Sequence, residues 1–263
     1  MKFCDRIDGV AAEIGSVNTL VRREGKLWGY NTDIDGFRYM LRRAGISLKG
    51  KKVLILGSGG ASLTARAAAK TEGAREIVVV SRTGEDNYEN LPRRHAGAGV
   101  LINTTPVGMW PDLEGAPVDL GLLPELTAVV DVIYNPGRTN LLLQAAERNL
   151  PCAGGLSMLA AQAKRAEELF FDKSISDGET EKMVSRLWRD RTNIVLVGMP
   201  GSGKTTVGRC LAGCSGKPFV DLDEEIIRKA GKPIPDIFAQ EGEDAFRKLE
   251  HAVLTEACAK SGQ

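Results

Sequence analysis

Two glycine-rich loops in this sequence are suited to holding phosphate groups. The first, Gly57–Ala61, follows the apolar run Lys52–Leu56, and the second, Gly198–Thr205, follows Asn193–Val197. Glycines after a buried strand let backbone N–H groups approach a phosphate, and the helix that follows directs its positive dipole end at the anion. One loop is typical of dinucleotide sites and the other of nucleoside triphosphate sites. The sequence therefore predicts two nucleotide-binding domains in one chain.

The first loop and the next expected strand indicate which dinucleotide is bound. Ile77–Val80 is followed by Ser81-Arg82-Thr83, and not by the acid that would accept a ribose 2′-hydroxyl. An acid would repel a 2′-phosphate, whereas Arg82 between two hydroxyl donors would pair with it. The pattern favours NADP over NAD, and the alternative interpretation is an exposed arginine at a strand end. The residues expected to bind the cofactor are Gly57, Ser58, Gly59, Gly60, Ala61, Ser81, Arg82 and Thr83.

The second loop is a complete P-loop, which predicts a nucleoside triphosphate with Mg²⁺. Its backbone N–H groups would cradle the β-phosphate, Lys204 would neutralise the β and γ groups, and the Thr205 hydroxyl would ligate the metal. The residues expected to bind the triphosphate are Gly201, Ser202, Gly203, Lys204, Thr205 and Thr206.

Two carboxylates end a further expected strand, Pro218–Asp223. Side chains two apart on a strand point the same way, so Asp221 and Asp223 would share one face. One would serve the magnesium shell and the other the acceptor hydroxyl. An aspartate here is also a common helix N-cap, in this case for the run that starts at Glu224, and the two roles are compatible.

The elements that must position these loops alternate between strand-like and helix-like patterns from Lys51 to Leu150. This alternation predicts an α/β domain with a doubly wound parallel sheet. A second strand, loop and helix set begins at Asn193, with its helix at Thr206–Leu211. The strands expected in the first sheet are Val53–Leu56, Glu76–Val80, Gly99–Asn103 and Ala128–Ile133, and the helices are Ala61–Lys70 and Asn140–Asn149.

Bulk composition narrows the class of partner. The net charge of +1 provides no field for a polyanion, so neither nucleic acid nor an anionic membrane is an expected partner. No apolar stretch is long enough for a membrane span, and the first residues lack a signal-peptide core. The five cysteines form no CxxC pair and are expected to be buried, reduced thiols in a cytoplasmic protein. Neither histidine has metal-ligand spacing, and oligomeric state cannot be inferred.

Five ordered motifs resemble the shikimate dehydrogenase family. They are Ile14–Leu20, Gly29–Phe37, Asn103–Met109, Asp131–Pro136 and Gly154–Gln162.

The resemblance implies NADP-dependent reduction of 3-dehydroshikimate to shikimate, and it assigns roles to residues in these motifs. Asp33 would be one half of a Lys/Asp catalytic pair, and no residue here matches the lysine, which in the family precedes the position where this chain starts. Glu85 and Asp86 stand where the family often has a basic residue after Arg82. Substrate contacts would be Asn18, Asp33, Tyr134 and Gln162, and the cofactor would be bordered by Asn103, Thr104, Thr105 and Gly155.

The segment Ile237–Glu250, together with the P-loop and the aspartate pair, resembles shikimate kinase. By this resemblance Asp223 would bind the ring hydroxyls of shikimate, Arg247 its carboxylate, and Asp221 would lie near the metal, with ATP as the phosphoryl donor. A planar guanidinium matches a carboxylate. The chain stops before the glycine triplet and the arginine-bearing lid of the family.

Together the resemblances imply part of a bifunctional enzyme on the route to aromatic amino acids, with weak activity expected from the chain as it stands. The alternatives are a quinate/shikimate dehydrogenase of broader specificity and a non-catalytic nucleotide-binding sensor. The expected fold is a Rossmann-type NADP-binding domain followed by a partial P-loop kinase domain. The expected divisions are a remnant of the substrate domain at 1–35, the NADP domain at 36–172, a polar linker at 173–191 and the truncated kinase domain at 192–263.

Overall fold

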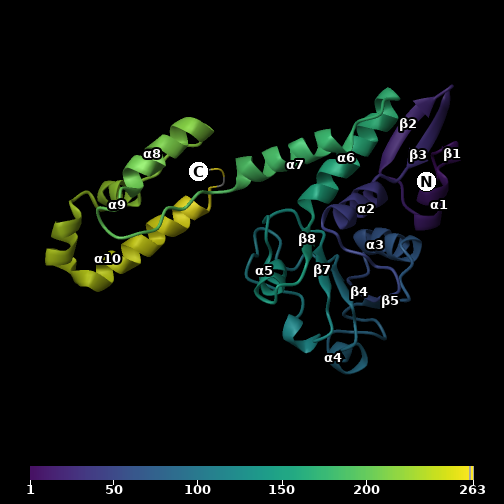
Figure 1. Ribbon diagram of the computed structural model, residues 1–263, viewed down its shortest axis with the longest axis horizontal. Coiled ribbons are helices and arrows are strands. Elements are labelled where there is room, and N and C mark those ends of the chain that lie inside the picture. Colours follow the sequence, from purple (N-terminus) through teal and green to yellow (C-terminus); the bar gives the residue numbers. More distant parts are fainter. Residues whose placement is uncertain (261, 263) are drawn as a thin grey trace. The chain divides into compact units, whose positions relative to one another are not determined.

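The structure is a computed structural model that describes residues 1–260 and 262. It consists of two compact units, Met1–Val184 and Ser185–Gln263 (Figure 1).

A five-stranded parallel sheet in the order β5-β4-β6-β7-β8 is the centre of the first unit. It confirms the predicted doubly wound α/β fold. Both faces are covered, so alternate residues of one strand enter opposite cores: Val53 and Ile55 lie in one, Leu54 and Leu56 in the other. The strands are β4 (Lys52–Leu56), β5 (Glu76–Val80), β6 (Val100–Asn103), β7 (Ala128–Asp131) and β8 (Cys152–Gly154).

Helices cover the two faces of this sheet. The first core contains residues of α2 and α3, and the second contains residues of α4, η1 and α5. The bounds are α2 (Asp33–Arg43), α3 (Gly60–Thr71), α4 (Leu91–Arg94), η1 (Leu120–Leu122), α5 (Asn140–Glu147) and α6 (Leu156–Phe171).

A small three-stranded sheet precedes α2. Strands β2 (Thr19–Arg23) and β3 (Lys26–Tyr30) form a hairpin, and β1 (Arg6–Ile7) pairs with β3 on its other side. The two residues between the hairpin strands, Glu24 and Gly25, both have positive φ, which suits the twist of a tight hairpin. Helix α1 (Gly9–Ile14) lies between β1 and β2 in the chain.

Helices α2 and α6 pack closely because α2 carries a glycine at the contact. A Cβ added to Gly36 would lie 2.5 Å from the Met158 carbonyl oxygen, closer than real side chains come. Any larger residue would therefore push the two helices apart. The close approach matters for function because both helices carry predicted substrate residues.

The segment 173–191, expected as a linker, is largely helical, with α7 spanning Asp177–Arg191. The side chains of α7 are mostly polar, and its buried residues are Thr180 and Val184. Glu181 accepts hydrogen bonds of 2.6 and 2.7 Å from Arg43 on α2, and the Lys164 ammonium on α6 lies 2.8 Å from Asp177.

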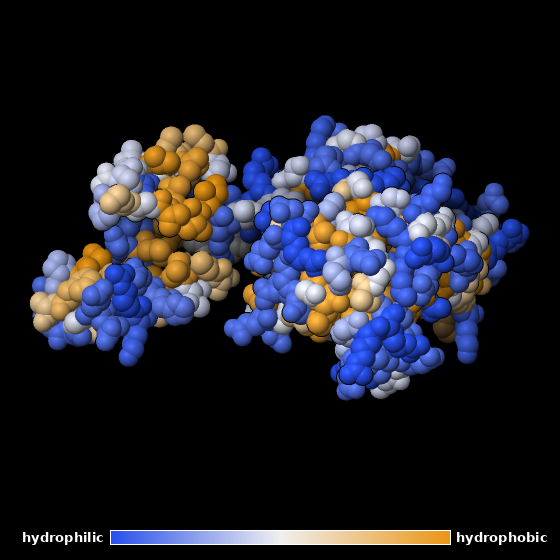
Figure 2. All heavy atoms as spheres, turned by 60° about the horizontal axis from the view of Figure 1, so that its bottom comes forward, coloured by the Kyte–Doolittle hydropathy of each residue, from blue (hydrophilic) through white to orange (hydrophobic). Residues whose placement is uncertain are grey.

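The second unit contains α8 (Lys204–Ser215), α9 (Leu222–Ala230) and α10 (Ile234–Cys258), and α10 kinks at Gly242, where φ is 81°. The strands predicted at Asn193–Val197 and Pro218–Asp223 are wrong: the described residues form no strand there. A strand needs a hydrogen-bonded neighbour, and neither segment pairs with one. Both segments line a hollow of about 740 Å³, along which Figure 2 shows hydrophobic residues gathered.

Two expectations drawn from composition have different outcomes. No helix among residues 1–260 is long and apolar enough to cross a membrane. The expectation of buried thiols is wrong, because Cys152, Cys210, Cys214 and Cys258 are exposed.

We predict that Gly36→Ala destabilises the first unit despite the better helix propensity of alanine. The added methyl group would collide with the Met158 carbonyl, which should lower the free energy of unfolding by about 1–3 kcal/mol. Urea denaturation monitors this change. Gly178→Ala is the matched control, since its Cβ would meet no atom closer than 3.6 Å, and it should be neutral or slightly stabilising. Equal stability of the two variants would contradict the predicted clash.

Candidate cofactor and substrate sites

The strand register brings the predicted cofactor residues to one edge of the large sheet. Leu56 at the end of β4 pairs with Val80 of β5 and with Asn103 of β6. Asn103 pairs in turn with Asp131, and Asp131 with Gly154. The segments that begin at Gly57, Ser81, Thr104 and Gly155 therefore all leave the sheet at its carboxyl edge, where ligands of open α/β sheets bind.

The glycine-rich loop leaves space in front of the N-terminus of α3. Gly57 has a φ of 101°, and a Cβ there would lie 2.9 Å from the Thr104 hydroxyl oxygen. Gly59 and Gly60, in contrast, face open space, since a Cβ on either would meet nothing within 4 Å. No side chain caps α3, so its first N–H groups are available to an anion.

Arg82 lies in the exposed segment after β5. Within residues 1–260 its guanidinium forms no hydrogen bond or ion pair. Its charge opposes in part the rise that burial causes in the pKa of the Tyr88 phenol. Thr83 is also exposed and Ser81 is partly buried. The arginine is thus free to pair with an anion at this edge.

A buried carboxylate, Asp131, organises the segments after β6 and β7. It accepts hydrogen bonds from Asn103 Nδ2 (3.1 Å), the Ile133 amide (3.1 Å) and Thr139 Oγ1 (2.7 Å). Burial raises its pKa, and these three donors oppose that rise. The Asn103 side chain is therefore committed inside the protein, since its Oδ1 also accepts from Thr105. The groups that this part of the edge can offer to a ligand are therefore the backbone and the Thr104–Thr105 segment.

The packing around Gly155 leaves no room for a side chain. It begins the turn into α6, and its amide donates to the Ile133 carbonyl at 2.9 Å. A Cβ at this position would overlap the Val132 carbonyl group. A side chain would displace α6 from the end of the sheet.

Three residues assigned to the substrate lie around one buried hydroxyl, that of Thr32. The Asn18 Oδ1 accepts from the Thr32 amide at 2.9 Å and from its hydroxyl at 3.3 Å. The Thr32 hydroxyl also lies 3.3 Å from Gln162 Oε1 on α6. Asp33 is the next residue and the first of α2. The structure thus brings Asn18, Asp33 and Gln162 together, and Thr32 is a residue that sequence reasoning missed.

Asp33 is half-buried at the start of α2, where its amide donates to Asn31 Oδ1 at 3.0 Å. Burial raises the pKa of its carboxyl group, and a hydrogen bond from the Asn18 side chain lowers it in part. Among the described residues, no lysine forms an ion pair with Asp33. Tyr134 lies on a different element, in the segment after β7, and 43% of it is exposed.

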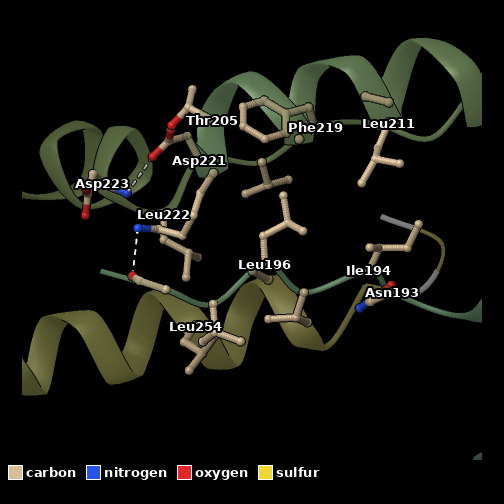
Figure 3. A pocket seen from close by; sticks show the side chains of 18 of the residues that line it. Asn193, Ile194, Leu196, Thr205, Leu211, Phe219, Asp221, Leu222, Asp223 and Leu254 are labelled. Carbon is tan, nitrogen blue, oxygen red and sulfur yellow. Dashed lines mark hydrogen bonds between the residues drawn. The ribbon is translucent and has the colours of Figure 1, made fainter. Parts of the chain in front are cut away.

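The P-loop of the second unit forms a turn whose backbone carbonyls accept hydrogen bonds from its own lysine. Gly201 and Gly203 have φ of 76° and 83°, and the Lys204 ammonium donates to the carbonyls of Gly198 (2.8 Å) and Met199 (2.9 Å). The Thr205 hydroxyl lies 3.1 Å from Asp221 Oδ2 (Figure 3). A hydroxyl and a carboxylate side by side are oxygen donors that suit Mg²⁺, which takes few protein ligands beside phosphate oxygens.

The other carboxylate and the arginine do not join this pair. Asp221 N-caps α9, accepting from the Asp223 amide at 3.1 Å, so the expected shared strand face is wrong. Asp223 lies apart from the Thr205 and Asp221 oxygens in Figure 3. Arg247 forms ion pairs with Glu243 and Glu250 of its own helix, and it does not line the hollow beside the P-loop.

Known proteins similar to this chain cover about 70% of it. The shikimate dehydrogenase (NADP(+)) of Clostridium perfringens is 34% identical over 204 residues, which cover 70% of this chain and 75% of that protein. A chorismate mutase/shikimate 5-dehydrogenase fusion protein from Clostridium acetobutylicum is 34% identical with a TM-score of 0.68, covering 71% of this chain and 72% of the other.

A third relative was solved with ligands. The shikimate 5-dehydrogenase of Thermus thermophilus, in complex with NADP(H) and shikimate, is 33% identical with a TM-score of 0.61, covering 70% of this chain and 72% of that one. The family profile described as shikimate kinase matches residues 200–263. Identity, coverage and shared fold together show that this chain belongs to the shikimate dehydrogenase family.

Proposed function

We propose that the first unit binds NADPH and a dehydroshikimate-type ring at the residues described above, and reduces the ring ketone. The observation that carries the proposal is the cluster of Asn18, Gln162 and Asp33 around Thr32. Amides and a carboxylate at one point are what a polyhydroxylated ring requires. The open space before α3 and the unpaired Arg82 support a phosphorylated dinucleotide at the adjoining edge of the sheet.

The chemistry assigned to these side chains follows from their contacts. When bound, NADPH supplies the hydride. The amide oxygens of Asn18 and Gln162 face Thr32. The Gln162 amide N–H groups, and the Asn18 N–H that does not bind Asp33, are therefore left to donate to ring hydroxyls. Asp33 holds a proton more readily than an exposed carboxyl because burial raises its pKa, which suits the acid/base half of the reaction.

We further propose that the second unit carries part of a shikimate kinase site for ATP and Mg²⁺. The match of residues 200–263 to that family supports this assignment, as does the Thr205–Asp221 contact. Lys204 would turn from the loop carbonyls to the phosphates when a nucleotide arrives. In this proposal Asp223 and Arg247 bind shikimate only after Arg247 leaves its intrahelical ion pairs.

Replacing Arg82 by methionine should weaken NADPH binding selectively. The guanidinium would otherwise pair with the 2′-phosphate, so its loss should raise the Kd for NADPH about 10-fold or more and change that for NADH by less than about 2-fold. Titration calorimetry gives both constants. Arg93→Met is the control, because Arg93 is also exposed and carries the same charge. A parallel loss for both cofactors would refute the role of Arg82.

Thr32→Val should weaken shikimate binding without affecting NADPH. The substitution keeps the shape but removes the hydroxyl between Asn18 and Gln162, which should raise the Kd for shikimate about 5- to 10-fold. The NADPH affinity of the same variant serves as its internal control for folding. An unchanged shikimate affinity would show that Thr32 does not orient the two amides.

For the second unit, Lys204→Met should raise the Kd for Mg·ATP at least about 10-fold, because the P-loop loses its positive charge. Lys248→Met, an exposed lysine of α10, should leave it unchanged. Calorimetry with Mg·ATP distinguishes the two results, and equal affinities for both variants would exclude the P-loop as the nucleotide site.

A further inference from the structure

The segment after β5 contains two acids close to Arg82, and the structure shows where their charges go. Arg94 of α4 forms ion pairs with both, at 3.0 Å to Glu85 Oε1 and 2.9 Å to Asp86 Oδ1. Its guanidinium also donates to the Glu85 carbonyl at 3.4 Å. Two carboxylates that would repel a 2′-phosphate are thereby paired with one cation.

His95, the residue after α4, makes a second contact with the same carboxylate. Its side chain is 7% exposed, and its Nε2 lies 2.8 Å from Asp86 Oδ1. Its Nδ1 is buried and has no hydrogen-bond partner among the described residues. The hydrogen bond from His95, and then the Arg94 charge, hold the pKa of Asp86 below its usual value. Among the residues that the structure describes, this buried ring therefore hydrogen-bonds only to Asp86.

Asp86 connects these contacts to the backbone that presents Arg82. Its carbonyl accepts from the Ser81 amide at 3.0 Å, which closes the segment into a loop with Arg82 inside it. Gly84 fits tightly within this loop, since a Cβ there would lie 2.7 Å from Ser81 Oγ. From the other side Asn90 donates to the Glu85 carbonyl at 2.8 Å. The loop is thus fixed to α4 at Glu85 and Asp86.

We propose that Arg94 and His95 are positioning residues that set the preference for the phosphorylated dinucleotide. Arg94 holds Glu85 and Asp86 in ion pairs, and His95 adds a hydrogen bond to Asp86, so that the Ser81–Asp86 loop is fixed with Arg82 facing the 2′-phosphate. Neither residue contacts the cofactor in this arrangement. The inference rests on the proposed NADPH site, and it explains how a loop with two acids after its arginine can still favour a phosphate.

Arg94→Met and His95→Phe, with His95→Gln as the conservative variant, test the inference in the full chain. Binding of NADPH and NADH is measured by calorimetry, and melting temperature by scanning calorimetry. Arg94 is 44% exposed, so its variant should remain folded. We expect Arg94→Met to raise the Kd for NADPH about 10-fold and that for NADH by less than about 2-fold. His95→Phe should act in the same direction, and His95→Gln, which keeps a donor for Asp86, should restore most of the affinity.

Salt separates the two ways in which these residues act. The charge of Glu85, whose side chain is 85% exposed, is screened at high ionic strength once Arg94→Met releases it, whereas a displaced loop is not corrected by salt. A defect that persists at high salt indicates positioning of the loop, and one that disappears indicates repulsion alone and overturns the positioning role.

The outcomes also separate this inference from the proposed function. A wild-type chain that binds NADPH and NADH equally contradicts the cofactor assignment itself. A wild-type chain that prefers NADPH, with variants that keep the same Kd ratio or lose both affinities together, overturns only the role of Arg94 and His95. Arg93→Met again provides the charge-matched control, with no change expected.

Discussion

The carboxyl edge of the large sheet depends on one buried charge. Burying a carboxylate is costly unless hydrogen bonds replace its water, and Asp131 obtains three, from the end of β6, from the backbone after β7 and from the residue before α5. Two of these donors lie where a strand ends, and the third, Thr139, lies at the far end of the connection from β7 to α5. A single buried carboxylate thus holds the end of β6 against both ends of the β7–α5 connection, because either segment could move only by leaving the carboxylate unsatisfied.

The predicted substrate residues are likewise held in place by a few polar contacts. A glycine in α2 allows α6 to approach closely, and that approach lets Gln162 reach the same hydroxyl as Asn18. Helix α7 supports α2 and α6 from outside through Glu181 and Asp177. Packing therefore determines the geometry of the polar cluster, and the hydrogen bonds then determine which atoms face outward.

Sequence predicts the first unit well because its signals are local. The strands β4 to β7 are continuous apolar runs, as buried parallel strands are. Strand β8, with three residues, gives no such signal, and α7 is hidden by a polar surface around two buried residues. The two strands wrongly predicted in the second unit have the right local composition, but a sheet is a non-local structure, and these segments find no partner.

The site residues divide in the same way, into those that local motifs predict and those whose role depends on distant partners. Motifs identify Asn18, Asp33 and Gln162 as a group, although they are far apart in the chain. Thr32 and Asp131 went unassigned within those motifs because their importance lies in partners distant in sequence. Arg247 shows the reverse case, since the motif predicts a substrate contact and in the structure the guanidinium pairs with acids of its own helix. The second unit has a small apolar core between α9 and α10, formed by Ile226, Ile237, Phe246 and Val253. This core is much smaller than the two cores around the large sheet, and it should unfold separately from them. The chain is therefore expected to lose its structure in two steps and not in one cooperative transition.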